Sequence, residues 1–210
     1  MIRILIADDH TLIREGFKKI LREERDLAIV KEAKTGNEAL LYAAKEKLDI
    51  VLLDIGLPDI SGIDVLKEIK KRHPKLAVLM LSMYPEDRFA IRALRAGASG
   101  YITKESASEE LVLAIRKIIA GGRYVSPALA EKLANEIQTP SSKAPHETLS
   151  DREHEILCML ASGKTVSQIA EQLHLSVKTI STYRTRILEK MNMKTNAELT
   201  HYAISNKLVD

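Results

Sequence analysis

Three carboxylates lie where two short apolar runs of the chain end. Asp8 and Asp9 follow the run Ile2–Ala7, and Asp54 closes the run Ile50–Asp54. If both runs are strands of one doubly wound sheet, their carboxyl ends line the crevice in which such sheets bind ligands. Three converging carboxylates repel one another unless a cation neutralises them, and an all-oxygen ligand set suits Mg²⁺. The pattern therefore predicts a magnesium site.

A hydroxyl and an ammonium group are expected at the same place. Ser82 ends the apolar run Val78–Ser82, and Lys104 follows the run Gly100–Thr103. A metal, a central carboxylate, a hydroxyl and an ammonium suit phosphoryl transfer to Asp54, because positioning and charge neutralisation supply most of that catalysis. Taken singly, an aspartate can cap a helix and a lysine can be a solvated edge charge. Their joint occurrence at successive strand ends favours the site.

Short apolar runs alternate with helical patterns over residues 1–120. The two central runs are apolar without alternation, which is typical of strands covered on both faces. The order predicts an α/β doubly wound, five-stranded parallel sheet. The expected strands are Ile2–Ala7, Ala28–Ala33, Ile50–Asp54, Val78–Ser82 and Gly100–Thr103. The expected helices are Thr11–Glu23, Gly36–Glu46, Gly62–His73, Asp87–Ala96 and Ser108–Ala120.

These residues resemble the receiver domain of response regulators, a flavodoxin-like fold. The resemblance rests on Asp8-Asp9, Asp54, Ser82, Lys104 and the stretch LPDISG at Leu57–Gly62. It implies that Asp54 is the phosphoacceptor, that Lys104 pairs with the phosphoryl oxygens, and that Ser82 moves to hydrogen-bond one of them. Tyr101 has the position of the aromatic residue that turns inward once Ser82 has moved, although plain packing would explain it equally well.

The same resemblance implies a ligand set for Mg²⁺. Asp9, Asp54 and the backbone carbonyl of Gly56 would bind the ion directly, and Asp8 would act mainly through water. Lys104 is followed by Glu105, whereas many receivers have proline there.

The second half of the chain has a different pattern. Residues 138–148 are polar and contain two prolines, which indicates a linker. We therefore predict a receiver at 1–122, a linker with a short helix (about 127–137) at 123–148, and a small all-α domain at 149–210.

Ser150 and Glu153 have the capping-box spacing at the start of a helix. Two further helices, Val166–Leu173 and Val177–Met191, are joined by a short turn, and the second is basic with small polar residues, as insertion into a DNA major groove requires.

This region resembles the LuxR-type helix-turn-helix, so the whole chain resembles NarL/FixJ-type two-component response regulators, with Tyr183-Arg184 as in global regulators of the GacA kind. The matching residues are Leu149, Arg152, Glu153, Gly163, Ile169, Ala170, Leu173, Ser176, Thr179, Lys190 and Glu198. The resemblance implies base-edge contacts from Ser181, Thr182 and Thr185. The residues expected to contact phosphates are Lys178, Tyr183, Arg184, Arg186 and Lys190, although Lys190 could equally be a solvated helix residue.

The partners expected are double-stranded DNA, a cognate sensor histidine kinase that phosphorylates Asp54, a second copy of the chain after phosphorylation, and RNA polymerase as a candidate. The last expected helix, about Asn196–Asn206, could form the dimer contact or pack within its own domain. The protein would not be an enzyme, since the receiver would catalyse only its own phosphorylation and dephosphorylation.

Composition excludes several other classes. The single Cys158 excludes an internal disulfide and a cysteine metal cluster. The N-terminal MIRILIADDH reaches carboxylates too soon for a signal peptide, and no apolar run approaches membrane-spanning length, so we expect a cytoplasmic protein without a membrane partner. Three alternatives stay open: a Mg²⁺-dependent phosphatase with an aspartyl intermediate, a phosphorylation-independent DNA-binding regulator, and RNA binding, which the scarcity of aromatic residues disfavours.

Overall fold

A computed structural model describes residues 1–83, 86–127, 129–131, 133, 144–206 and 208–209. The chain divides into two compact units, Met1–Leu133 and Ala134–Asp210. Each unit is described by itself below.

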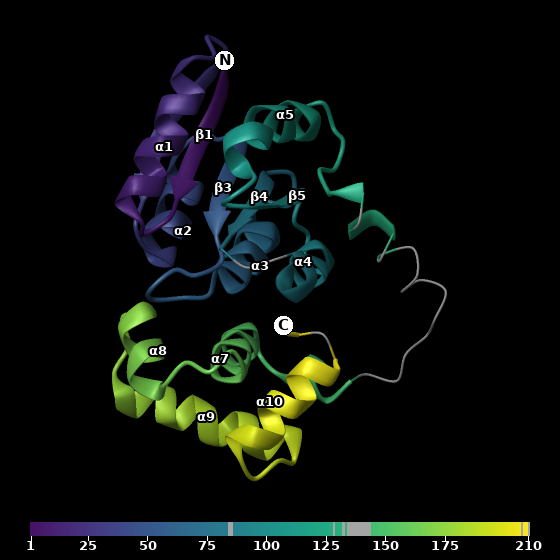
Figure 1. The fold of residues 1–210 in the computed structure, drawn as a ribbon. Helices are drawn as coiled ribbons and strands as arrows, with labels where there is room; N and C mark the ends of the chain where they lie inside the picture. The colour runs from purple at the N-terminus through teal and green to yellow at the C-terminus, as the bar shows by residue number, and fades with distance from the viewer. Residues whose placement is uncertain (84–85, 128, 132, 134–143, 207, 210) are drawn as a thin grey trace. The chain divides into compact units, whose positions relative to one another are not determined.

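The first unit is built on a parallel sheet in the order β2-β1-β3-β4-β5 (Figure 1). Its strands are β1 (Ile2–Ala7), β2 (Leu27–Ala33), β3 (Ile50–Asp54), β4 (Ala77–Ser82) and β5 (Gly100–Thr103). The expected doubly wound five-stranded sheet is confirmed, and each strand begins within one residue of its expected position. The chain order reverses between β1 and β3, so a crevice opens at their carboxyl ends.

Helices cover both faces of this sheet because neighbouring strand residues point to opposite sides. Ile4 and Ile6 pack with α1 (Thr11–Arg22) and α5 (Ala107–Ile119) on one face. Leu5 and Ala7 pack on the other face. The helices of that second face are α2 (Gly36–Lys45), α3 (Gly62–Arg72) and α4 (Glu86–Arg95). This double burial explains why the central strands are apolar without alternation.

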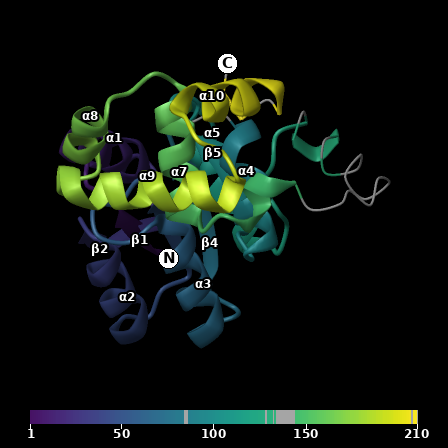
Figure 2. The same ribbon diagram turned by 90° about the horizontal axis from the view of Figure 1, so that it is seen from below.

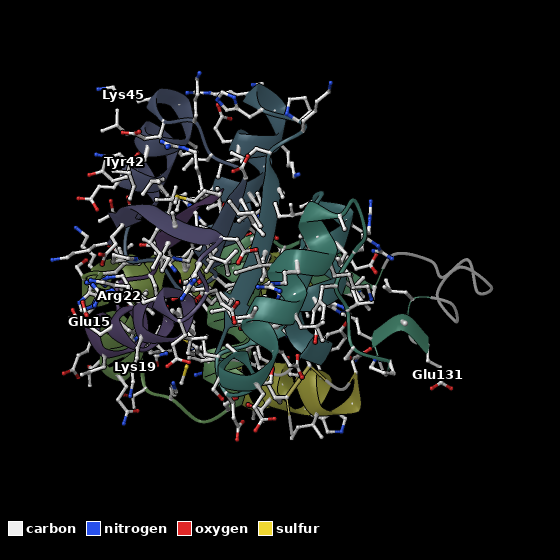
Figure 3. All side chains as sticks on the ribbon, turned by 90° about the horizontal axis from the view of Figure 1, so that it is seen from above. Glu15, Lys19, Arg22, Tyr42, Lys45 and Glu131 are labelled. Atoms are coloured by element: carbon white, nitrogen blue, oxygen red, sulfur yellow. The ribbon has the colours of Figure 1, made fainter. Side chains whose placement is uncertain are left out.

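Helix α1 shows how the sequence sets these faces. Phe17 and Leu21 are buried against the sheet, four residues apart on one side of the helix. Glu15, Lys19 and Arg22 are exposed on its outside (Figure 3).

The chain after α5 returns to the sheet. Tyr124 forms a parallel bridge to Gly100: its N–H donates to the Ser99 carbonyl (3.0 Å) and its carbonyl accepts from the Tyr101 N–H (3.1 Å). Leu129 is buried in the core of the first unit. Tyr124 and Leu129 therefore pack with the first unit, while residues 128, 132 and 134–137 of the short helix expected in the linker lie outside the described part of the chain. The domain limits at 122 and 148 stay a prediction.

The second unit is helical wherever it is described as regular structure. It contains a short 3₁₀ helix, η1 (Pro145–Thr148), followed by α7 (Asp151–Ala161), α8 (Val166–Gln172), α9 (Val177–Met191) and α10 (Asn196–Ser205). Helix α8 lies at the beginning of α9, and α10 follows the end of α9 (Figure 2). Ser150 and Glu153 form the expected capping box at the start of α7.

The turn between α8 and α9 has defined ends. His174 has a positive φ of 50° within the turn. The side chain of Ser176 then accepts a hydrogen bond from the Thr179 N–H and caps α9. The expected two helices joined by a short turn are thus confirmed.

Candidate functional site

The polar residues expected at the strand ends converge at one edge of the sheet. The ammonium Nζ of Lys104 lies 2.7 Å from Asp54 Oδ2 and 2.8 Å from Asp8 Oδ2. All three side chains are almost completely buried. The lysine therefore bridges two carboxylates that belong to different strands, with little water to screen the interaction.

The electrostatics of Asp54 follow from this arrangement. Burial disfavours its charged form, and together with the neighbouring Asp8 this outweighs the attraction of Lys104, which raises the pKa of Asp54 from 3.8 to about 6. The Gly56 N–H also donates a hydrogen bond to this carboxylate, which acts in the opposite direction. The ionised form of Asp54 is thus destabilised by its surroundings, and added positive charge would stabilise it.

A cluster of four possible metal ligands surrounds this carboxylate. Asp8, Asp9, His10 and Asp54 each offer one ligand atom, and these atoms lie within 4.8 Å of one another. Two buried carboxylates beside one ammonium leave net negative charge in the site, and a divalent cation would compensate it. The donor set, mostly carboxylate oxygen, therefore fits the Mg²⁺ that receivers use.

His10 is the member of this cluster that the sequence interpretation missed. Its Nδ1 lies 2.7 Å from Asp9 Oδ1 and 3.1 Å from Asp8 Oδ1. Its position directly after the acidic pair was the available signal, but a histidine in a polar turn is not by itself evidence of a ligand.

Ser82 and Tyr101 are both fully buried. Ser82 ends β4, and its carbonyl accepts a hydrogen bond from the Lys104 N–H (2.7 Å). This bond joins the end of β4 to the residue that follows β5. Tyr101 packs within the core layer that includes residues of α4. The inward ring is the orientation that the switch would need, and simple packing requires the same orientation.

The loop that follows Asp54 is held by two close contacts. A side chain at Gly62 would place its Cβ 2.0 Å from the Asp54 carbonyl oxygen, so only glycine allows α3 to start there. The Asp59 carboxylate accepts the N–H groups of Gly36 (2.6 Å) and Asn37 (3.0 Å) at the start of α2. Burial raises the pKa of Asp59, but the donated N–H groups of Asn37 and Gly36 outweigh it and lower that pKa overall.

Arg14 is a second residue that the sequence interpretation missed. It is buried on α1, where Nη1 donates to the Asp8 carbonyl (2.6 Å) and Nη2 to Thr11 Oγ1 (3.3 Å). It thereby fixes the turn that carries the acidic pair.

Helix α9 presents the residues expected to contact DNA. The small hydroxyl residues are exposed and hydrogen-bond to carbonyls one turn back in the same helix: Ser181 to Val177, Thr182 to Lys178, and Thr185 to Ser181. Lys178 and Arg186 are also exposed, and Tyr183 is half-buried.

Two of the expected phosphate contacts have partners within the second unit. Arg184 Nε donates to Asn196 Oδ1 (2.6 Å), at the start of α10. Lys190 Nζ lies 2.6 Å from Glu153 Oε2, so it connects the end of α9 to the capping box of α7. For Lys190 this ion pair favours a structural role within the domain.

The sheet, its acidic edge and the helix-turn-helix together define a class: a receiver-type domain followed by a helix-turn-helix domain. Comparison with known protein families agrees. Residues 4–116 match the response regulator receiver domain, and residues 147–203 match the bacterial regulatory proteins of the luxR family. The chain belongs to the response regulators that carry a LuxR-type DNA-binding domain, the NarL/FixJ family.

Relatives of similar length match from end to end. The response regulator GacA of Pseudomonas protegens is 40% identical over 210 residues, which is 100% of this chain and 99% of the relative. The response regulator UvrY of Escherichia coli is 35% identical over 209 residues, covering 99% of this chain and 96% of the relative.

Solved structures agree with this assignment. A LuxR-family response regulator from Aurantimonas sp. SI85-9A1 is 37% identical with a TM-score of 0.60, covering 65% of this chain and 98% of that chain. RcsB from Salmonella enterica serovar Typhimurium, bound to promoter rprA in the presence of phosphomimetic BeF3-, is 25% identical with a TM-score of 0.64, covering 98% and 100%. Among the described residues, no helix is both long and apolar enough to cross a membrane.

Proposed function

We propose that Asp54 accepts a phosphoryl group from a sensor histidine kinase and that this shifts the protein toward a dimer that binds DNA and regulates transcription. The observation that carries the proposal is the buried Lys104 bridge between Asp54 and Asp8 in a chain that also exposes a basic helix-turn-helix. As a regulator of transcription, it would act in the cytoplasm.

The chemistry follows from the residues present. A carboxylate oxygen of Asp54 forms a bond to phosphorus, and the bond between phosphorus and the histidine nitrogen of the kinase breaks, so its electron pair stays on that nitrogen. Lys104 already contacts Asp54 Oδ2, so a small rotation lets its ammonium hold a phosphoryl oxygen. Ser82, at the end of β4, donates its hydroxyl to another. Mg²⁺, held by Asp9, Asp54 and the Gly56 carbonyl with Asp8 through water, would neutralise the phosphoryl charge.

Coupling to the second unit needs a change at the outer strands. If Ser82 moves to the phosphoryl group, the space behind it changes, and this would stabilise the inward position that the buried Tyr101 ring already has beside α4. The Tyr101 N–H is hydrogen-bonded to Tyr124 at 3.1 Å, so this strand is also connected to the start of the linker. A shift in β5 therefore reaches the segment that leads to the DNA-binding unit.

The DNA interface is assigned to α9. Its hydroxyls at 181, 182 and 185 would exchange their bonds to the helix for bonds to base edges, which gains little net energy because a bond is lost for each one made. Affinity would therefore depend mainly on phosphate contacts from Lys178, Arg184 and Arg186, with Tyr183 beside them. Two copies would read two half-sites. RcsB has been solved as dimers bound to DNA.

The deciding experiment measures phosphorylation, mass and DNA binding on the same samples. Wild type, Asp54→Asn and the control Asp64→Asn, an exposed aspartate on α3, are incubated with Mg²⁺ with and without acetyl phosphate. Intact-mass spectrometry reports the added phosphoryl group, sedimentation equilibrium reports the dimer, and a genomic fragment pool reports DNA binding.

We expect all three signals in wild type and Asp64→Asn and none in Asp54→Asn. Equal DNA binding with and without the donor would contradict the phosphorylation switch and favour a phosphorylation-independent regulator. Continuous release of phosphate from an added phosphate ester would favour the phosphatase instead.

A further inference from the structure

The imidazole of His10 faces the acidic site although its side chain is half exposed to solvent. Its Nδ1 lies 2.7 Å from Asp9 Oδ1, 3.1 Å from Asp8 Oδ1 and 3.9 Å from Asp54 Oδ2. One ring nitrogen thus approaches all three carboxylates at once.

The local backbone holds the ring in this place. His10 is the residue before α1 and has an extended conformation, with φ −78° and ψ 104°. Its N–H donates to Asp8 Oδ1 at 2.8 Å, which folds the turn back over the acidic pair. The imidazole makes no capping bond to α1, so the helix does not require a histidine at this position.

Two of the three separations match those between ligands of one cation. Ligand atoms at about 2.1 Å from a shared ion lie about 3–4 Å apart in tetrahedral or octahedral geometry. The distances of 3.1 Å to Asp8 Oδ1 and 3.9 Å to Asp54 Oδ2 fall in that range. The distance of 2.7 Å to Asp9 Oδ1 is that of a hydrogen bond, so the two groups have to separate slightly to share an ion. Lys104 contacts Oδ2 of Asp8, which leaves Asp8 Oδ1 to face the ring, and it also contacts the same Asp54 Oδ2 that lies 3.9 Å from Nδ1. A bound ion would therefore share the Asp54 carboxylate with the ammonium.

We propose that His10 is a nitrogen ligand of this site and that the site therefore binds a borderline divalent cation such as Zn²⁺ or Co²⁺ more tightly than Mg²⁺. The inference rests on the proposed carboxylate metal site and adds a ligand and a metal class to it. Imidazole suits Zn²⁺ and Co²⁺, whereas Mg²⁺ prefers oxygen ligands and keeps several waters. A site of three carboxylates and one imidazole resembles the mixed nitrogen and oxygen sets that bind such ions.

Direct binding of metal to the full-length protein tests this. Calorimetric titrations with Zn²⁺ and, separately, Mg²⁺ are run on wild type, His10→Asn, Asp9→Asn and the control His174→Asn. His174 is exposed in the turn before α9 with φ 50°, a conformation that asparagine tolerates. We expect His10→Asn to weaken Zn²⁺ binding by about tenfold or more and to leave Mg²⁺ binding within about twofold. Asp9→Asn should weaken both, and His174→Asn neither.

A spectroscopic readout identifies the ligand atom. In ¹⁵N-labelled protein, Zn²⁺ should shift the Nδ1 resonance of His10, and Co²⁺ should give a visible absorption band that changes in His10→Asn. Equal Zn²⁺ affinity in wild type and His10→Asn, with Asp9→Asn weakened, would overturn the histidine ligand and leave the acidic site intact. Unchanged binding of both metals in Asp9→Asn would show instead that the acidic site itself was wrongly assigned.

Discussion

Replacing Asp54 by asparagine should make the metal-free protein more stable near neutral pH, although it removes the proposed phosphoacceptor. Burial raises the pKa of Asp54 from 3.8 to about 6, despite the attraction of Lys104. A carboxylate whose pKa is raised on folding destabilises the folded state whenever it is ionised. The difference of about 2 pKa units corresponds to about 3 kcal/mol above pH 6. Asparagine imitates the neutral carboxyl, and its Oδ1 can still accept from Lys104.

The pH dependence gives this prediction its signature. The penalty is present in full above about pH 6 and fades as the pH falls, because the folded protein then takes up a proton before the unfolded chain does. The stability advantage of Asp54→Asn over wild type should therefore be largest near pH 7 and disappear close to pH 4. Urea unfolding of the first unit in EDTA, followed by circular dichroism, measures it across this range.

Two comparisons sharpen the result. Asp64→Asn, an exposed change on α3, should leave stability within about 0.5 kcal/mol. Added Mg²⁺ should stabilise wild type more than Asp54→Asn, since an ion that binds only the folded state shifts the equilibrium toward it. An advantage that is absent, or that stays constant between pH 4 and 7, would refute the assignment of Asp54 as a buried carboxylate with a raised pKa.

Three further substitutions, the first with a matched control, test other parts of the structure. Gly62→Ala should destabilise the first unit by roughly 2–4 kcal/mol in urea unfolding, because its Cβ would meet the backbone carbonyl of Asp54, which cannot move aside as a side chain can. Gly16→Ala, with no atom within 4 Å of the added Cβ, should be neutral or stabilising; equal losses at both glycines would refute this. Burial raises the pKa of Glu153, but the hydrogen bonds from Lys190 and from the residue that caps α7 lower it overall, so its stabilisation should be lost as pH falls through that lowered pKa. Glu153→Gln, followed by circular dichroism against pH, should lack this acid-dependent loss, and an identical pH profile would contradict the ion pair. Arg184→Ala should weaken binding to all DNA sequences and reduce the salt slope by about one charge, whereas unchanged affinity at low salt would show that it contacts no phosphate.

The sheet could be predicted from the sequence because burial on both faces leaves a strong pattern. Strands β3 and β4 are apolar at consecutive positions, and the acidic and basic side chains stand directly after strands, so the topology alone brings them to one edge. The return of the chain to β5 leaves no such pattern. It consists of a single bridge at Tyr124, and the close approach depends on the missing side chain of Gly100, whose Cβ would lie 2.7 Å from the Tyr124 carbonyl oxygen. A glycine at the start of a strand does not reveal which backbone approaches it.

The convergence of the acidic residues was predictable from the sequence, but the local geometry around them was not. Repulsion among Asp8, Asp9 and Asp54 favours positive charge beside them wherever the exact atoms lie, and Lys104 supplies part of it. The His10 N–H donates to the Asp8 side chain two residues earlier, a local bond that an aspartate in a turn commonly makes. The approach of the ring to Asp54, by contrast, requires β1 and β3 to pair. The ring comes close to all three carboxylates only in the folded chain. The metal preference proposed for this site therefore depends on the fold and cannot be derived from the sequence motif alone.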